Sequence, residues 1–269
     1  MTQVPAQLVA AGPPTWTDTA HLAGLQLDQL PDGAALQTRY DRKFLVERDR
    51  VAELVIGLGD HLQVLESAGT RLTTATTSYF DTSTLRTYQD HLQRRRRRFK
   101  IRTRHYGDPT SAMLELKVKG ARGQTIKHRW PHPASCPERL DAAARGVLTD
   151  ALHAAYTQAL PDGLELVAQT RFQRLTLVDP QARERITIDH DLTVTAGGRR
   201  VELGHRCVVV EVKAAHRRGP SSAAIRVMGL RPAPISKYCL GLVATHPDLR
   251  GNPWRGTLRR LAPVVGTLD

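Results

Sequence analysis

The sequence predicts an α+β protein in which antiparallel strands predominate, and three observations support this prediction. Successive segments, such as 99–106 and 111–120, alternate charged and apolar residues with the period of two that is typical of strands. Short turn sequences, Gly-Asp-Pro and Gly-Ala-Arg-Gly, separate these segments. Segments rich in Ala and Leu, with helical spacing of their apolar residues, flank them.

The N-terminal third is predicted to contain a tail and a mixture of helices and strands. Residues 1–20 are rich in Ala, Pro and Thr, which is typical of a mobile tail. The spacing of Leu22, Leu25, Leu27 and Leu30 predicts a short amphipathic helix. The following elements are a strand at 36–47, a helix at 48–60, a Thr-rich strand at 70–81 and a helix at 82–93.

The rest of the chain continues with strands and ends in helices. The predicted strands are 99–106, 111–120, 124–131, 164–179, 183–191, 199–204 and 206–215. The predicted helices are 137–160, 221–230 and 236–246. Because no repeat or linker divides the chain, we expect one domain over residues 21–246 and a C-terminal tail over 247–269.

The composition indicates a folded, strongly basic protein. The chain has 269 residues, of which 41% are hydrophobic, and 39 Lys and Arg against 26 Asp and Glu give a formal net charge of +13. Such a charge is typical of proteins that bind polyanions. The three cysteines lack metal or disulfide spacing, and neither a secretory signal nor a membrane-spanning stretch is found. We therefore expect a cytoplasmic protein.

The alternation after Phe99 places cations in rows. Lys100, Arg102 and Arg104 share one strand face, opposite Phe99, Ile101 and Thr103. Residues two apart on a strand lie roughly 6.7 Å from each other, so neighbouring cations would repel by about 2–3 kcal/mol at an effective dielectric constant near 20.

Similar rows recur in other strands. A solvated outer face would explain any one of them. Several together predict a curled sheet around a basic cavity that holds a polyanion and metal.

Other chemistries find little support in the sequence. It contains no GxxxxGK[ST] loop, no GxGxxG after a strand, no HExxH and no GxSxG motif. The run Arg94–Arg98 lies between a predicted helix and a predicted strand. It is either a solvated turn or a contact for product or nucleic acid.

Several segments together resemble one family. These are RYDRKFLV (39–46), SYFDTSTLRTYQDHLQRRRRRFKIRTRHYG (78–107), LELKVKGARGQTIKHR (114–129), TRFQRLTL (170–177), RITIDHDL (185–192), VVVEVK (208–213) and ISKY (235–238). They resemble the VTC (vacuolar transporter chaperone) domain, the polyphosphate polymerase branch of the CYTH-like, triphosphate tunnel metalloenzyme superfamily. The resemblance implies a closed antiparallel β-barrel tunnel with flanking helices, lined by Lys, Arg and Glu.

The resemblance also assigns roles to individual residues. It implies phosphate contacts at Lys43, Arg102, Arg104, Lys117, Lys127, Arg171, Arg185 and Lys237. Of these, Arg102, Arg104 and Lys117 are the expected catalytic residues, together with Glu211. Glu211 matches the metal-holding glutamate of the family, and Glu115 is expected to assist it, with Mn²⁺ or Mg²⁺ as the ion.

The activity implied is metal-dependent transfer of the terminal phosphate of ATP to a polyphosphate chain, with release of ADP. The partners are then ATP and polyphosphate or pyrophosphate, without specific nucleic acid, and a membrane partner protein is conceivable. Two alternatives stay open: a tunnel-type triphosphatase, and a non-enzymatic module that binds polyphosphate or nucleic acid. The stretch Arg39–Lys43 lacks one acid of the ExExK pattern of the hydrolytic branch, which counts against the triphosphatase.

Overall fold

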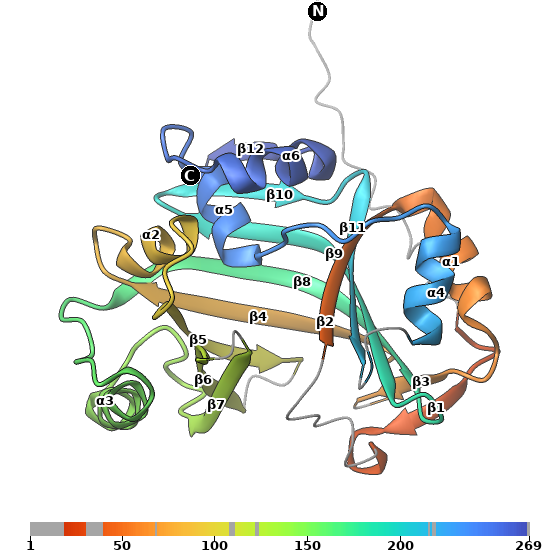
Figure 1. Ribbon diagram of the computed structural model, residues 1–269, viewed down its shortest axis with the longest axis horizontal. Coiled ribbons are helices and arrows are strands. Elements are labelled where there is room, and N and C mark those ends of the chain that lie inside the picture. Colours follow the sequence, from red (N-terminus) through yellow and green to blue (C-terminus); the bar gives the residue numbers. More distant parts are fainter. Residues whose placement is uncertain are drawn as a thin grey trace, which may run out of the picture.

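The computed structural model describes residues 19–30, 40–67, 69–107, 111–121, 124–214, 216 and 219–267 (Figure 1). Its strands are β1 (Ala23–Gln26), β2 (Tyr40–Glu47), β3 (Gln63–Glu66), β4 (Leu72–Asp81), β5 (Phe99–Tyr106), β6 (Ala112–Lys119), β7 (Thr125–His132), β8 (Glu165–Asp179), β9 (Glu184–Ala196), β10 (Arg199–Leu203), β11 (Cys207–Ala214) and β12 (Val264–Thr267). Its α-helices are α1 (Val51–Leu58), α2 (Arg86–Leu92), α3 (Ala142–Tyr156), α4 (Pro220–Val227), α5 (Lys237–Thr245) and α6 (Asn252–Leu261). Two 3₁₀ turns, η2 (Leu27–Gln29) and η4 (Arg48–Arg50), complete the described elements.

All of these strands belong to one sheet, which is antiparallel except where β1 pairs with β3. The longest path through it runs β12-β10-β9-β8-β4-β5-β6-β7, and β11 joins β9 to β2. The predicted α+β class with mostly antiparallel strands is therefore confirmed. None of the helices in the described part of the chain combines the length and apolarity that a membrane crossing requires.

The sheet is curved, but its described strands do not close into a barrel. Within those strands β2 pairs only with β11 and β7 pairs only with β6, so both remain edges. The segment before α5 runs along β2, where the Ala233 amide donates a hydrogen bond to the Lys43 carbonyl over 2.8 Å. This contact occupies one position on the edge of β2 that a further strand would need. The closed barrel expected from the resemblance is thus not confirmed, because the described strands form an open, curved sheet.

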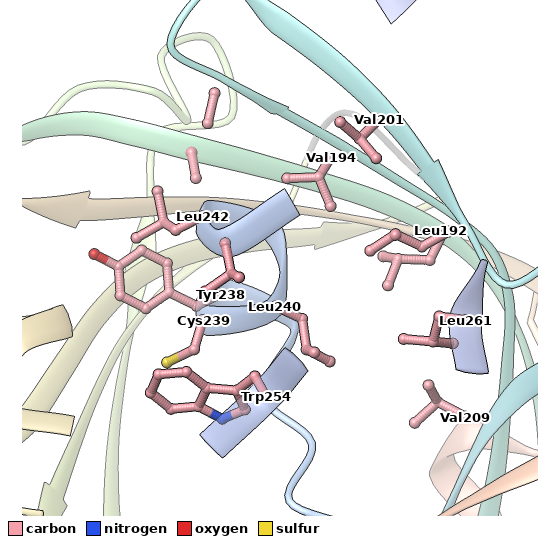
Figure 2. Packing of buried hydrophobic residues seen from close by; sticks show 14 of the residues in the cluster. Leu192, Val194, Val201, Val209, Tyr238, Cys239, Leu240, Leu242, Trp254 and Leu261 are labelled. Carbon is pink, nitrogen blue, oxygen red and sulfur yellow. The ribbon is translucent and has the colours of Figure 1, made fainter. Parts of the chain in front are cut away.

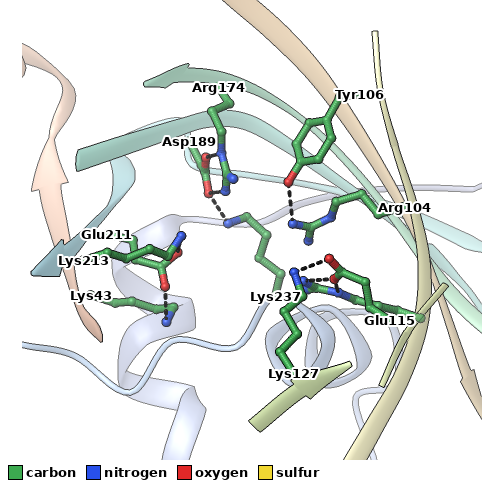
Figure 3. Close-up of polar contacts among 11 residues, drawn as sticks. Lys43, Arg104, Tyr106, Glu115, Lys127, Arg174, Asp189, Glu211, Lys213 and Lys237 are labelled. Atoms are coloured by element: carbon green, nitrogen blue, oxygen red, sulfur yellow. Dashed lines mark hydrogen bonds and ion pairs between the residues drawn. The ribbon is translucent and has the colours of Figure 1, made fainter. Parts of the chain in front are cut away.

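The curvature brings distant strands together across the concave face. Four strands, β9, β8, β4 and β5, separate β11 from β6 in the sheet. Nevertheless Glu211 on β11 acts on the pKa of Lys117 on β6, and Figure 3 shows side chains from β2, β6, β7 and β11 around one space. The rows of charged residues therefore converge.

Helices cover the convex face, and this covering decides which residues point inward. α3 packs on β5 and β6, where Ile101, Leu114 and Leu116 form one apolar cluster with Leu148. α1 and α4 pack in the same way against β2, β8, β9 and β11 in a second cluster. Because strand side chains alternate, burying these apolar rows under helices leaves the charged rows on the concave face.

One end of the concave face is filled by α5 and α6. Their apolar side chains pack with those of β8 to β11 in a third cluster (Figure 2). A Cβ on Gly241 of α5 would lie 2.6 Å from Val194 of β9, so only glycine allows this close packing. The charged residues consequently occupy the space beyond the N-terminus of α5.

Two segments differ from the sequence-based expectations, and a third is almost untested. The helix expected at Leu22–Leu30 is instead β1 followed by η2, because β1 gains a strand partner in β3, which the sequence pattern did not reveal. The segment 247–269 contains α6 and β12, and Trp254 and Leu261 are buried in the third cluster, so its described part is not a free tail. The expected tail at 1–20 lies almost entirely outside the described residues.

Candidate functional site

The charged residues of the concave face form one group, which we call the interior cluster. Its members are Lys43, Lys100, Arg102, Arg104, Glu115, Lys117, Lys127, Arg174, Arg185, Asp189, Glu211, Lys213 and Lys237. Figure 3 draws most of them and shows that they point toward one another from different strands and from the start of α5. Three carboxylates among ten cations divide the cluster into three ionic units.

The first unit surrounds Glu115, whose side chain is only 3% exposed. Arg102 donates from Nε to this carboxylate over 2.5 Å, Arg129 donates over 3.1 Å, and Lys127 also pairs with it. Burial alone would raise the pKa of Glu115, but the charges of Arg102 and Lys127 outweigh it and hold that pKa far below its ordinary value. This carboxylate offsets much of the repulsion expected along the β5 row.

The second unit joins β8, β9 and α5. Arg174 forms two hydrogen bonds to Asp189, of 2.6 and 2.8 Å, in the parallel geometry that suits a guanidinium and a carboxylate. Lys237, the first residue of α5, pairs with the same carboxylate, and its ammonium lies 4.3 Å from the centre of the Phe172 ring. Asp189 thus fixes two cations at the N-terminus of α5.

The third unit lies on the neighbouring strands β2 and β11. Glu211 pairs with Lys43 over 2.9 Å and with Lys213 over 3.3 Å. Burial would raise the pKa of Glu211, but these two lysines outweigh it and hold the pKa well below its ordinary value. Burial lowers the pKa of Lys213 to about 8, since Glu211 only partly compensates for it.

Three cations of the interior cluster, Lys100, Arg104 and Lys117, form no salt bridge to a carboxylate within the described residues. Lys100 donates to the Ser236 hydroxyl over 2.9 Å. Arg104 donates to the hydroxyls of Thr77 over 2.8 Å and Tyr106 over 3.0 Å. The pKa of Lys117 lies well below its ordinary value, mainly because of the charge of Arg102 and secondly because of burial. Such a pKa shift shows that this part of the interior carries an excess of positive charge.

The pKa of Tyr106 is shifted by the same excess of positive charge. Burial alone would raise the pKa of its phenol, but the charges of Arg104 and Arg174 outweigh burial and lower that pKa to about 7. The phenol therefore ionises near neutral pH at the end of the cluster opposite α5.

The structure brings together most of the residues expected from the sequence. Lys43, Arg102, Arg104, Glu115, Lys117, Lys127, Arg185, Glu211 and Lys237 all belong to the interior cluster. Arg171 does not, because its side chain is exposed on the convex face, while Arg174 of the same strand points inward. Leu175 and Leu177 of β8 are buried under α1 and α4, which forces the even-numbered positions of β8 inward.

Sequence reasoning also missed Asp189, Lys213 and Tyr106 as site residues. The alternating rows of β9 and β11 already placed Asp189 and Lys213 beside expected residues, and continuing the β5 row by one step reaches Tyr106.

The arginine run does not belong to the interior cluster. Arg94–Arg97 are exposed in the turn before β5, and Arg94 has φ 55°, as expected for a solvated turn.

A divalent metal in the interior cluster would need substrate phosphates as ligands in addition to protein side chains. Within the described residues no three His, Cys, Asp or Glu side chains lie close enough together to hold an ion. Mg²⁺ is, however, commonly bound by one or two carboxylates together with substrate phosphates. Glu211, which lies between two lysines that suit phosphate, fits this mode of binding.

The interior cluster can therefore neutralise a chain of phosphates. Its arginines can donate paired hydrogen bonds to phosphate oxygens, and its lysines supply mobile point charges. Cations fixed around a site where charge develops are what phosphoryl transfer requires of a protein.

The comparisons with known proteins agree in part with this geometry. The model of the VTC domain family matches residues 38–246, which include every residue of the interior cluster. No curated protein matches the chain by sequence.

Several solved structures are similar to this chain. A putative adenylate cyclase from Bacillus halodurans is 14% identical, with a TM-score of 0.46 over 74% of this chain and 94% of that one. A putative adenylyl cyclase from Hippeastrum, described as having a dominant triphosphatase activity, is 12% identical, with a TM-score of 0.46 over 76% and 94%. A protein from Pyrococcus horikoshii is 10% identical, with a TM-score of 0.40 over 74% and 97%.

Proposed function

Because this chain belongs to the VTC domain family, we propose that it is a polyphosphate polymerase, which transfers the terminal phosphoryl group of ATP to a polyphosphate chain and releases ADP. The observation that supports this proposal most is the interior cluster, in which cations from many strands converge around only three carboxylates. A polyphosphate chain carries the negative charge that this arrangement lacks.

Each group of the cluster has a role in the proposed reaction. Arg102, Arg104 and Lys117 bind the oxygens of the transferred phosphoryl group and stabilise the charge that develops there. The remaining cations, from Lys43 on β2 to Lys237 on α5, hold the donor and the acceptor in line. The attacking phosphate oxygen is already ionised, so the reaction needs no general base.

Glu211, with Glu115 in support, would hold Mn²⁺ or Mg²⁺ together with phosphate oxygens of the substrate. When bound, such an ion neutralises charge on the phosphates and orients them. In its absence, Lys43 and Lys213 balance the Glu211 carboxylate. Substrate phosphates would compete for these lysines and so free the carboxylate for the ion.

The test is a synthesis assay with the purified protein. ATP, Mn²⁺ and a pyrophosphate primer are incubated with it, and polyphosphate on a gel and ADP in solution are measured. We expect both products to accumulate together. Arg104→Ala should abolish them, whereas Arg96→Ala, in the exposed turn, should leave them unchanged. Release of orthophosphate without polymer would instead identify a triphosphatase.

A further inference from the structure

A second basic hollow lies at the end of the concave face that is filled by α5 and α6. Its volume is about 330 Å³, and its lining comes from the end of β2, the start of β11 and the outer side of α6. The lining residues are Glu47, Arg206, Cys207, Gly256, Arg259 and Arg260. Its size is at the lower end of the range of roughly 300–1,000 Å³ that is common for small-ligand pockets.

The hollow shares a strand face with the interior cluster. In the ladder of β2 and β11, Glu47 is opposite Cys207, and four residues earlier on β2 Lys43 is opposite Glu211. Because residues two apart share a face, both pairs point to the concave side, about 13 Å apart along the strand.

An apolar layer separates the two. Leu45 and Val209 form the pair between them in the ladder, and both belong with Leu261 of α6 to the third apolar cluster. Figure 2 shows Val209 and Leu261 of this layer. A ligand in the hollow would therefore not contact the interior cluster.

The charge of the hollow is unbalanced. Three arginines line it against one glutamate, and among the described residues no salt bridge involves Arg206, Arg259 or Arg260. Arg260 donates one long hydrogen bond of 3.4 Å to the Leu45 carbonyl. Three guanidinium groups that line one small hollow are suited to paired hydrogen bonds with a phosphate.

We propose that this hollow binds a small phosphate-bearing anion at a site separate from the interior cluster. The wall formed by α6 lies outside residues 38–246, so the site is an addition to the part of the chain that matches the family. It does not depend on the proposed polymerase activity. Because the three arginines are exposed, binding should weaken as the salt concentration rises.

Gly256 allows the charge of the hollow to be changed without disturbing the fold. A Cβ at this position would meet no atom within 4 Å, and any other residue except proline favours a helix more than glycine does. Gly256→Glu and Gly256→Gln introduce side chains of the same size that differ in charge. Their comparison therefore isolates electrostatics from filling of the hollow.

The experiment is a calorimetric titration of the full chain with tripolyphosphate, without metal and at low salt. We expect two classes of site in the wild-type protein. Gly256→Glu should weaken one class by about tenfold or more relative to Gly256→Gln, because a new carboxylate would repel the bound anion. The other class, that of the interior cluster, should be unchanged in both.

A second pair of variants tests the arginines directly. Arg259→Ala should weaken the same class of site, whereas Arg255→Ala, on the same helix but outside the lining, should not. The absence of any class of site that weakens in both Gly256→Glu and Arg259→Ala would overturn the proposal. Equal affinities in Gly256→Glu and Gly256→Gln, or equal effects of Arg255→Ala and Arg259→Ala, would also overturn it. Because no turnover is measured, an absence of polymerase activity would leave these outcomes unaffected.

Discussion

Replacing Glu211 by glutamine separates the structural role of this carboxylate from its proposed role as a metal ligand. Its ion pairs with Lys43 at 2.9 Å and Lys213 at 3.3 Å are each worth about 5–6 kcal/mol of Coulomb energy at an effective dielectric constant near 20. Desolvation of the charges cancels much of this energy, and loss of one partner of a buried pair typically costs about 3–5 kcal/mol. We therefore expect Glu211→Gln to lower the free energy of unfolding of the empty protein by about 3 kcal/mol.

The same substitution should strengthen metal-free binding of polyphosphate. A phosphate oxygen bound to Lys43 or Lys213 would lie roughly 6 Å from the carboxylate, where repulsion amounts to about 2–3 kcal/mol. Its removal corresponds to a gain in affinity of roughly 30- to 150-fold. Turnover of ATP should nevertheless be lost, because a neutral amide is a weak ligand for a hard divalent ion.

Three measurements on one variant test this reasoning: chemical denaturation, polyphosphate affinity in the presence of a chelator, and ADP release with Mn²⁺. Glu53→Gln, which removes an exposed carboxylate on α1, is the control and should change none of them. Retained turnover in Glu211→Gln would rule out the metal role. A loss of metal-free affinity together with turnover would show that Glu211 acts only by holding its two lysines in place.

Three further predictions concern residues that the structure singles out. Arg174→Ala should weaken metal-free polyphosphate binding at least about tenfold, whereas Arg171→Ala should change it less than about twofold. Similar losses of affinity in both variants would contradict the assigned faces of β8. Because the phenol of Tyr106, with its pKa lowered to about 7, gains negative charge as pH rises, polyphosphate affinity should fall above pH 7. Tyr106→Phe should reduce the slope of the profile measured between pH 6 and 9, although Lys127 and Lys213, with pKa values lowered to about 7 and about 8, still lose charge there. An unchanged slope would exclude the ionisation of Tyr106. Asp81→Asn should lower the free energy of unfolding, measured with urea, by about 2–3 kcal/mol, because Asp81 accepts hydrogen bonds from the start of α2 and from Tyr238 of α5. A change within experimental error would show that these hydrogen bonds contribute nothing to stability.

The sequence by itself determined which residues share a strand face. Alternation with period two follows directly from strand geometry, so the rows of β5, β6 and β11 could be predicted without knowing their neighbours. The prediction of β5 at 99–106 agrees with the structure residue for residue. The order of the segments quoted above was likewise enough to indicate the family, whose model matches residues 38–246.

Only the tertiary structure decided which face of a strand is the inner one. Arg171 and Arg174 have opposite parity on β8, and the choice between them depends on the helices that cover Leu175 and Leu177. A register shift between β8 and β9 also changes which residues of β9 point inward. Before the shift the inward residues are odd-numbered, as Asp189 is, and beyond it they are even-numbered. No local pattern encodes the packing of helices that lie far away in the sequence.

The partners of the charged groups were also decided by the tertiary structure. Glu115 pairs with Arg102 on the neighbouring strand, whereas Asp189 on β9 pairs with Lys237 from α5. Glu211 affects the pKa of Lys117 across the interior. These contacts depend on how strongly the sheet curves and on where α5 begins. Curvature and helix docking arise from the summed packing of all layers, and for this reason the sequence revealed the basic rows but not the ionic units that they form.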